Sequence, residues 1–287
     1  MKQRISTIQE VYKQGAEKLK EASVTEFQLD AWYLLEYVTG ISKAMYYAEP
    51  QRELSDEWIN KYEECIEKRS QRIPLQHITG EQEFMGLVFR VNEHVLVPRQ
   101  DTETLVEEAL KVLKDGDRVF DLCTGSGCIL LSLLKLTKAD GVSGMGADIS
   151  EEALEVAREN ARMLCLDADF IQGDLFENIP SGKKFNVIVS NPPYIPTDVI
   201  GGLQDEVKLH DPYIALDGKE DGLYFYRRII KESISYIKDK GWLMFEIGHD
   251  QGEAVKSLMK EAGYSKICVK KDLTALDRVV IGMYNEE

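Results

Sequence analysis

The stretch RVFDLCTGSGCILLSL, residues 118–133, decides the fold. It begins as a short apolar run, continues through two closely spaced glycines and becomes apolar again. This succession predicts a strand, a tight turn and a helix, the opening unit of an α/β sheet. Gly125 and Gly127 let the backbone turn sharply and approach a ligand with no Cβ in the way. The stretch therefore predicts a ligand-binding turn at the carboxyl end of a strand.

Short apolar strands alternate with amphipathic helices through the rest of the chain. The expected strands are 118–122, 142–148, 168–172, 185–190 and 241–247, and the expected helices are 128–137, 150–164, 222–238 and 250–262. This alternation indicates a mostly parallel sheet that is covered on both faces. Residues 265–271 and 278–284 are separated by a segment too short for a crossover helix, so these two strands should pair antiparallel. The sequence predicts an α/β fold of seven strands with an antiparallel last strand.

The first 80 residues are expected to form a small all-α domain. In the first helix, Ile8, Val11 and Leu19 belong to an apolar series that recurs at steps of three and four residues. In the second helix, Thr25 is the expected N-cap and Gly40 the expected end.

A β-hairpin is expected between the helical block and the sheet. Residues 87, 89 and 91 are apolar and alternate with their neighbours, and Asn92-Glu93-His94 is the expected turn. The predicted organisation is a helical domain at 1–80, a hairpin linker at 81–98 and an α/β domain at 99–287. The helix after the linker is expected to be capped by Asp101 or Thr102.

The composition is that of a globular protein in a reducing compartment. Hydrophobic residues make up 44% of the 287 residues, which suffices for a core. No apolar run approaches the roughly 18 residues of a membrane span, and the charged start KQRISTIQEVYKQ is unlike a secretory signal. The five cysteines include no C-x-x-C pair, so neither a disulfide framework nor a metal site is expected. These features predict a cytoplasmic protein without a membrane partner.

The net charge of −15 argues against direct nucleic-acid binding. Affinity for nucleic acid comes largely from Lys and Arg side chains that neutralise phosphates. A local basic patch can nevertheless exist in an acidic protein.

Acidic residues end three successive expected strands and complete a predicted cofactor site. Asp121 is placed to reach the amino-acid part of a nucleotide-like cofactor, Asp148 to accept bonds from two ribose hydroxyls, and Asp174 to meet an adenine amino group. The pattern G-x-G-x-x-G fails because Leu130 occupies its last position, and no P-loop is present. NAD and ATP are therefore disfavoured. A purely structural glycine turn is the alternative interpretation.

The fourth expected strand runs into Asn191-Pro192-Pro193-Tyr194. Two prolines cannot continue a central strand, and they fix the backbone of the loop. The side-chain carbonyl of Asn191 and the backbone carbonyl of Pro192 can each accept one N–H of a planar –NH2 group, and Tyr194 can stack on that group. The motif is typical of methyl transfer to a poorly nucleophilic nitrogen. A rigid loop with a surface tyrosine is the alternative.

With these motifs, the chain resembles the release factor glutamine methyltransferases along nearly its whole length. The segments that carry the resemblance are GEQEFMGLVFRVNEHVLVPRQDTETLVEEAL, DLCTGSGCILLSL, ADISEEALEVARENA, IVSNPPYIP, EDGLYFYRRII, EIGHDQGEAV and DRVV. The resemblance implies methylation of the glutamine in the Gly-Gly-Gln loop of class 1 peptide chain release factors. It also implies that the cofactor is S-adenosylmethionine and that the helical domain helps to recognise the release factor.

The resemblance assigns roles to residues at matching positions. It implies a cofactor turn formed by Cys123, Thr124, Gly125, Ser126 and Gly127, with Asp148 at the ribose. It implies that Asn191 contacts both cofactor and substrate, and that the stretch from Asn191 to Tyr194 holds the glutamine.

The sequence departs from the family pattern at two positions. Cys123 stands where the family usually has glycine, and Leu175 stands where many members carry a tryptophan near the adenine. The backbone at residue 123 must therefore accommodate a side chain, and leucine replaces an aromatic ring as the expected neighbour of the adenine at residue 175.

Three other functions remain as alternatives. The Asn-Pro-Pro-Tyr motif is shared with adenine-amine methyltransferases of nucleic acid, which the charge of −15 opposes. A non-catalytic cofactor-binding scaffold is opposed by the intact motif, and an NAD oxidoreductase by the glycine spacing and the antiparallel tail.

The enzyme is expected to act as a monomer. Arg99, Asp101 and Glu103 form a charged cluster that is either a solvated helix start or a group that orders the substrate region.

Overall fold

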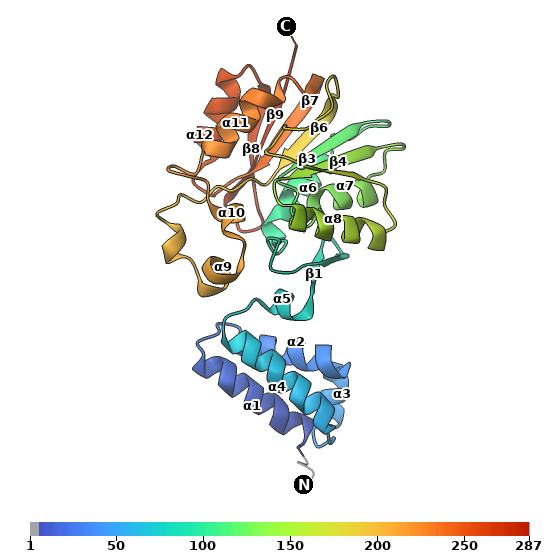
Figure 1. Ribbon diagram of the computed structural model, residues 1–287, viewed down its shortest axis with the longest axis vertical. Coiled ribbons are helices and arrows are strands. Elements are labelled where there is room, and N and C mark those ends of the chain that lie inside the picture. The colour runs from blue at the N-terminus through green and yellow to red at the C-terminus, as the bar shows by residue number, and fades with distance from the viewer. Residues whose placement is uncertain (1–5, 287) are drawn as a thin grey trace. The chain divides into compact units, whose positions relative to one another are not determined.

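The computed structural model describes residues 6–286, so the ends of the expected domains at residues 1–5 and 287 lie outside it. The chain divides into two compact units (Figure 1). The first unit contains the chain up to Gly80 together with Asp205–His210, and the second contains Glu81–Gln204 and the chain from Asp211 onward. The segment Asp205–His210 thus belongs with the helices although it lies far from them in sequence.

The first unit is helical, as predicted. Its helices are α1 (Ile8–Glu21), α2 (Phe27–Thr39), α3 (Lys43–Ala48), α4 (Asp56–Ser70), α5 (Leu75–Thr79) and the inserted α9 (Asp205–His210). They enclose a core that includes Ile8, Leu19, Leu34 and Leu35, all fully buried. The apolar residues of α1, spaced three and four residues apart, therefore face a core. Their burial stabilises the unit by about 25 cal/mol for each Å² of apolar surface removed from water.

The helix ends of this unit follow the sequence only in part. Gly40 ends α2 in the left-handed region with φ of 67°, as expected of a helix C-cap. The prediction that Thr25 caps α2 is wrong: the N-cap is Glu26, which makes no side-chain capping bond. The start of α2 is instead fixed by packing, because Ala31, Leu34 and Leu35 must be buried together.

A buried ion-pair network ties the inserted helix α9 to α2 and α4. The guanidinium of Arg69 donates to Asp30 Oδ2 at 2.7 Å and to Glu206 Oε1 at 2.9 Å. Arg69 and Asp30 are both buried, and Arg72 donates to the other oxygen of Glu206. Burial raises the pKa of Asp30, whereas the two arginines lower the pKa of Glu206 against its partial burial. Arg69 is therefore the centre on which three separate segments converge.

Replacing Asp30 with alanine should destabilise the helical unit by about 2 kcal/mol. Removing one partner of a buried pair commonly costs about 3–5 kcal/mol, and here Arg69 keeps Glu206. Urea unfolding followed by tryptophan fluorescence measures the change, because Trp32 and Trp58 both lie in this unit. The exposed Asp198, replaced in the same way, is the control. Equal midpoints for the two variants would contradict this role of the network.

The second unit contains a seven-stranded sheet in the order β5-β4-β3-β6-β7-β9-β8. The strands are β3 (Arg118–Leu122), β4 (Ser143–Asp148), β5 (Asp169–Gln172), β6 (Phe185–Ser190), β7 (Ile237–Glu246), β8 (Ser265–Lys271) and β9 (Asp277–Met283). The first five are parallel, and β9 lies antiparallel between β7 and β8. The predicted seven strands and reversed last strand are confirmed.

Helices cover both faces of this sheet (Figure 1). On one face, α6 (Glu103–Leu110), α7 (Cys128–Leu136) and α8 (Glu151–Met163) bury a core that includes Leu105, Leu130 and Val189. On the other, α11 (Tyr224–Ser233) and α12 (Gly252–Glu261) bury a core that includes Phe120, Tyr226 and Phe245. Short helical segments also occur at η1 (Gln100–Thr102), η2 (Ile200–Gly202) and α10 (Tyr213–Leu216). Thr102 is the N-cap residue of α6, one of the two that were expected, but its side chain makes no capping hydrogen bond because η1 leads directly into that helix.

The predicted hairpin exists, but its turn is not where it was expected. Strands β1 (Glu81–Phe84) and β2 (Leu87–Arg90) pair across Met85 and Gly86. The expected turn at Asn92-Glu93-His94 does form, but it follows β2 and does not close the hairpin. Met85 and Gly86 have positive φ, 54° and 73°, the geometry that favours tight two-residue hairpins. Glu103 stabilises this turn by accepting a hydrogen bond from the Met85 N–H at 2.6 Å. A long-range contact thus supports a methionine in a position that usually requires Asn or Gly.

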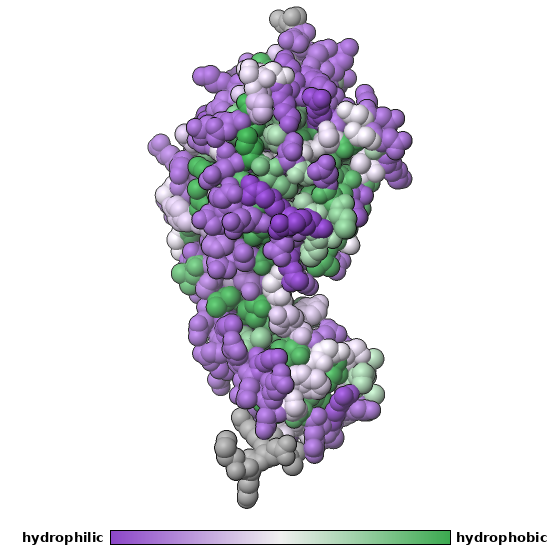
Figure 2. Space-filling model, turned by 45° about the vertical axis from the view of Figure 1, so that its right-hand side comes forward, coloured by the Kyte–Doolittle hydropathy of each residue, from purple (hydrophilic) through white to green (hydrophobic). Residues whose placement is uncertain are grey.

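Hydrophilic side chains cover most of the face seen in Figure 2. Within residues 6–286, no helix combines the length and apolar character needed to cross a membrane.

Candidate active site

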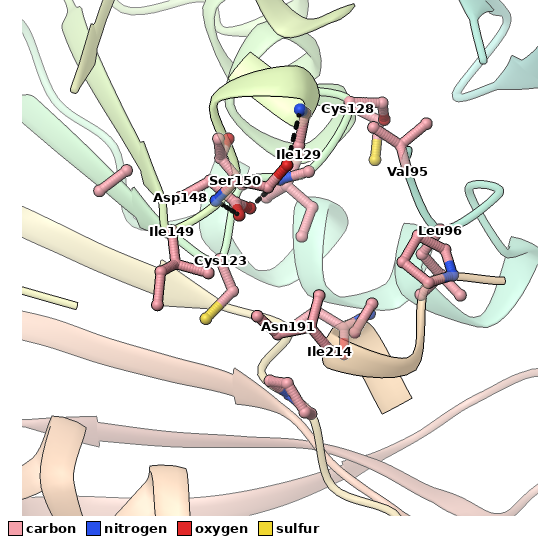
Figure 3. Close-up of a pocket in the computed structure, with 18 of the residues that line it drawn as sticks. Val95, Leu96, Cys123, Cys128, Ile129, Asp148, Ile149, Ser150, Asn191 and Ile214 are labelled. Carbon is pink, nitrogen blue, oxygen red and sulfur yellow. Dashed lines mark hydrogen bonds between the residues drawn. The ribbon is translucent and has the colours of Figure 1, made fainter. Parts of the chain in front are cut away.

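A cavity opens at the carboxyl edge of the sheet, where the strand order reverses. Strands β3 and β6 are neighbours there, with Leu122 opposite Ser190, and ligands of open α/β sheets bind at such a reversal. The cavity encloses about 1020 Å³ including its open mouth. Among the residues that line it are Cys123, Thr124, Gly125, Ser126, Asp148, Asp174, Leu175, Asn191 and Pro193 (Figure 3). The structure therefore brings most of the predicted site residues together.

The glycine turn is held by the carboxylate of Asp148. This side chain accepts hydrogen bonds from the N–H of Gly125 at 2.8 Å and from the N–H of Ser150 at 3.1 Å (Figure 3). Gly125 and Gly127 have φ of 54° and 78°, in the left-handed region that glycine adopts without strain. Burial raises the pKa of Asp148, while these backbone N–H groups oppose the rise. Asp148 thus has a fixed orientation with its carboxylate at the cavity wall.

Asp121 lies behind the turn and does not line the cavity. It is fully buried, and its Oδ2 accepts hydrogen bonds from Thr124 Oγ1 at 2.6 Å and from the N–H of Leu130 at 3.3 Å. Burial raises the pKa of this carboxyl group to about 7, although both hydrogen bonds lower it. Asp121 therefore connects the strand, the turn and the helix, and its direct contact with a cofactor stays a prediction.

Cys123 occupies a backbone position that favours glycine. Its φ is 59°, and Figure 3 shows its side chain directed between Ile149 and Asn191. Burial strongly raises the pKa of its thiol, so the group is a neutral side chain and not a thiolate nucleophile. The departure from the usual glycine is accommodated at the expense of backbone strain, which costs about 1–2 kcal/mol for an L-residue in this region.

A β-branched side chain should not be tolerated at position 123. We expect Cys123→Val to destabilise the protein by about 2 kcal/mol, because valine is more crowded in the left-handed region than cysteine. Cys268→Val is the control, since Cys268 lies in strand β8, where valine is favoured. Thermal unfolding of the two variants measures the difference. If Cys123→Val unfolds at the same temperature as the control variant, the backbone at residue 123 is unstrained.

Asp174 and Leu175 line the cavity just after the end of β5. The carboxylate of Asp174 is paired with the guanidinium of Arg228 at 2.9 Å, a partner in α11 that the sequence analysis missed. Leu175 is buried and has φ of 58°. Both oxygens of the Asp174 carboxylate accept from the same guanidinium nitrogen, which orients the carboxylate. Contact of either residue with an adenine ring stays a prediction.

The loop Asn191-Pro192-Pro193-Tyr194 leaves β6 beside the glycine turn. Asn191 and Pro193 line the cavity, whereas Pro192 and Tyr194 do not, and Tyr194 packs against the core. Burial raises the pKa of the Tyr194 phenol, which is therefore neutral. The motif is thus a rigid wall, and the polar side chain that it places at the cavity is that of Asn191.

Two glycines and a glutamine that were not predicted as site residues pack against this loop and fix its backbone. Gln251 Nε2 donates to the carbonyl of Tyr194 at 3.0 Å. A Cβ at Gly218 would lie 2.7 Å from Tyr194 backbone atoms, and one at Gly222 would lie 2.3 Å from the Tyr194 carbonyl oxygen. Only a residue without a side chain fits at such distances. Gly222 and Gln251 lie in two of the segments that carried the family resemblance. That resemblance was the sequence signal from which their importance could have been predicted.

The side chains of the charged cluster at residues 99–103 each have a specific partner, although those of Arg99 and Asp101 remain about half exposed. Arg99 lines the cavity and pairs with Asp211 at 2.7 Å, Asp101 faces Arg278 at 3.2 Å, and Glu103 holds the hairpin turn. Each side chain orders a different segment near the site. His249, by contrast, is exposed, as expected of a histidine at a helix entry.

The cavity fits a nucleoside-type cofactor by shape and by chemistry. Gly125 presents backbone with open space around it, and a fixed carboxylate stands at the end of β4. Apolar side chains that can enclose a planar ring also line the cavity, among them Ile149, Leu175, Ile214 and Phe225. Within residues 6–286, no group of three or more His, Cys, Asp or Glu side chains is placed to hold a metal ion.

The reversed last strand, the glycine turn and the Asn-Pro-Pro-Tyr loop define the class of protein, a Rossmann-like methyltransferase. Residues 113–278 match a methyltransferase domain family, and residues 10–80 match the PrmC N-terminal domain family. A solved methyltransferase from Pyrococcus furiosus has the same fold, with a TM-score of 0.53 and 17% identity over 71% of this chain and 91% of that chain.

Curated relatives identify the family. The chain is 40% identical to a release factor glutamine methyltransferase from Caulobacter vibrioides, over 97% of this chain and 97% of the relative. It is 39% identical to a release factor glutamine methyltransferase from Clostridium acetobutylicum, over 92% of this chain and 94% of the relative. The chain belongs to the release factor glutamine methyltransferase family.

Proposed function

We propose that this protein transfers a methyl group from S-adenosylmethionine to the side-chain amide nitrogen of the glutamine in the Gly-Gly-Gln loop of class 1 peptide chain release factors. The observation that carries the proposal is the position of Asn191, whose side chain lines the cavity next to the glycine turn. Kinship with release factor glutamine methyltransferases over nearly the whole chain supports glutamine as the acceptor.

The cofactor would be held by the turn and by the strand ends around it. Residues 123–127 would contact its amino-acid part, Asp148 its ribose hydroxyls, and Asp174 with Leu175 its adenine. When bound, S-adenosylmethionine supplies an electrophilic methyl group on a sulfonium centre. The fixed orientation of Asp148 supports its role, because a carboxylate already held by two N–H groups loses little freedom on binding.

The chain's own contribution to methyl transfer would be orientation of a weak nucleophile. The Asn191 side-chain carbonyl and the Pro192 backbone carbonyl would each accept one N–H of the substrate amide, which aligns its nitrogen with the methyl group and favours lone-pair character. Pro193 and Tyr194 would shape the rest of the pocket. No strong base is required, because the proton becomes acidic once the nitrogen bears positive charge. The rigidity of the loop, imposed by Gln251, Gly218 and Gly222, supports this role.

The partner would be a protein and not a nucleic acid. We propose that the helical unit contributes to recognition of the release factor, as its match to the PrmC N-terminal domain supports. The net charge of −15 does not favour a phosphate-binding surface. A substrate that acts in translation implies a cytoplasmic location, and we propose that the enzyme acts as a monomer.

A label-transfer experiment tests the proposed function. The protein is incubated with methyl-labelled S-adenosylmethionine and with a class 1 release factor, its Gln→Ala variant in the Gly-Gly-Gln loop, or duplex DNA. We expect label in the intact release factor alone. Label that enters DNA, or that persists in the Gln→Ala factor, would overturn the assignment of the substrate.

A further inference from the structure

Glu246 ends strand β7 directly beside Asn191. Strands β6 and β7 are parallel, and their register pairs Ser190 with Phe245, so the next residues, Asn191 and Glu246, lie side by side at the carboxyl edge. Glu246 is 2% exposed, and its Oε2 has no hydrogen-bond partner among the described residues. A buried carboxyl group with a free oxygen is uncommon in a folded protein and calls for an explanation.

The surroundings of Glu246 determine how the Asn191 amide must face it. Burial raises the pKa of Glu246 to about 7, and side-chain contacts with Thr102 and Asn191, together with the charge of Arg278, oppose the rise. At pH 8, above this pKa, Glu246 is mostly ionised, and an ionised carboxyl group only accepts hydrogen bonds. Of the two ends of the Asn191 amide, Nδ2 is therefore the one that can face Glu246 favourably. The carbonyl end, Oδ1, is then left for the cavity that Asn191 lines.

We propose that Glu246 is a positioning residue, which acts through Asn191 by holding the asparagine amide with Oδ1 toward the substrate. This inference rests on the proposed function, in which Oδ1 accepts an N–H of the glutamine amide. The two ends of an asparagine amide have nearly the same shape, so packing alone selects between them weakly. With the amide reversed, Nδ2 would meet the substrate –NH2 donor to donor, and the nitrogen would lose its alignment.

The fold around Glu246 depends on its backbone more than on its charge. Its carbonyl accepts a hydrogen bond from the Tyr226 hydroxyl at 2.9 Å, and it pairs with Val279 in β9. Both contacts persist when the side chain changes. A Glu246→Gln variant keeps the shape of the side chain and removes a charge whose burial is unfavourable, so it should melt no lower than the wild type at pH 8.

The first test measures which kinetic parameter Glu246→Gln changes. Glutamine can present either an acceptor or a donor to Asn191, so the preference for one amide orientation is lost. We expect kcat on the release factor to fall at least tenfold, while KM for the factor and the dissociation constant of S-adenosylmethionine stay within threefold. Glu253→Gln, an exposed carboxylate in α12, is the matched control and should leave all three values unchanged. An unchanged kcat, or a loss confined to KM or cofactor binding, would overturn the proposal.

The second test is a double-mutant cycle with Asn191→Ala, read by single-turnover label transfer. If Glu246 acts through Asn191, adding Glu246→Gln to the Asn191→Ala enzyme should change its residual rate less than twofold. A residue that merely supports the fold would reduce both enzymes by the same factor, which would overturn the proposal. A wild-type enzyme that methylates no release factor would overturn the proposed function, whereas an active wild type with an equally active Glu246→Gln variant would overturn only the inference on Glu246.

Discussion

Replacing Asn191 with alanine should lower kcat for methylation of the release factor by at least about a hundredfold. Removal of one preorganised hydrogen-bonding group from a reacting centre commonly costs a factor of about 10²–10³ in kcat. The rest of the loop should stay in place, because it is held by Gln251 and by close packing against Gly218 and Gly222. The loss should therefore fall on turnover and much less on binding.

Three measurements make this prediction specific. Single-turnover rates with methyl-labelled cofactor report the chemical step, and titrations with release factor and with S-adenosylmethionine report binding, which we expect to weaken by less than tenfold. Asn60→Ala is the control, since Asn60 is an exposed asparagine of helix α4. Undiminished turnover in Asn191→Ala would refute the catalytic role of this side chain.

Replacing Asp148 with alanine should weaken binding of S-adenosylmethionine by at least about a hundredfold. Two charge-assisted hydrogen bonds to ribose hydroxyls would be lost, and hydrogen bonds to charged groups contribute about 1.5–3 kcal/mol each. The N–H groups of Gly125 and Ser150 would also lose their acceptor, which loosens the turn. The lost hydrogen bonds and the loosened turn both weaken cofactor binding.

Calorimetric titration of the cofactor measures this change. Asp167→Ala is the matched control, because Asp167 is an exposed aspartate in the loop that leads to β5. We expect the control to bind as the wild type does. A dissociation constant for Asp148→Ala within threefold of the wild-type value would show that the ribose is held by other groups.

The sheet could be predicted from the sequence because its signals are local. Residues 185–190 were expected as a strand and form β6 with the same bounds, since a short apolar run between turn residues has few other interpretations. The expected helix at 222–238 was too long: α11 ends at Ser233, and Ile237 already belongs to β7. Periodicity continues smoothly past such a boundary, whereas the pairing of Ile237 with Phe185 that ends the helix is a long-range contact.

The site could be predicted where a motif is contiguous and not where contacts join distant segments. Asn191 and the glycine turn stand out as motifs, and both line the cavity. The pairing of Arg228 with Asp174 joins residues 54 positions apart, and no pattern in either segment announces it. The hairpin turn was misplaced for the same reason, because the support that Glu103 gives to Met85 becomes visible only in three dimensions.

The insertion of β9 between β7 and β8 imposes an order on the folding of this protein. Among residues 6–286, strand β8 pairs in the sheet with β9 alone, and β7 has an open edge until β9 is in place. Yet β9 is the last of the seven strands to be synthesised. β9 also carries Arg278, whose positive charge faces Asp101 and Glu246. The positive charge that faces Glu246, the neighbour of the proposed catalytic asparagine, is thus in place only once this last strand has been added. A nascent chain that stops before Asp277 would lack both the closed sheet and that positive charge, so activity should appear only after the whole α/β unit has been made.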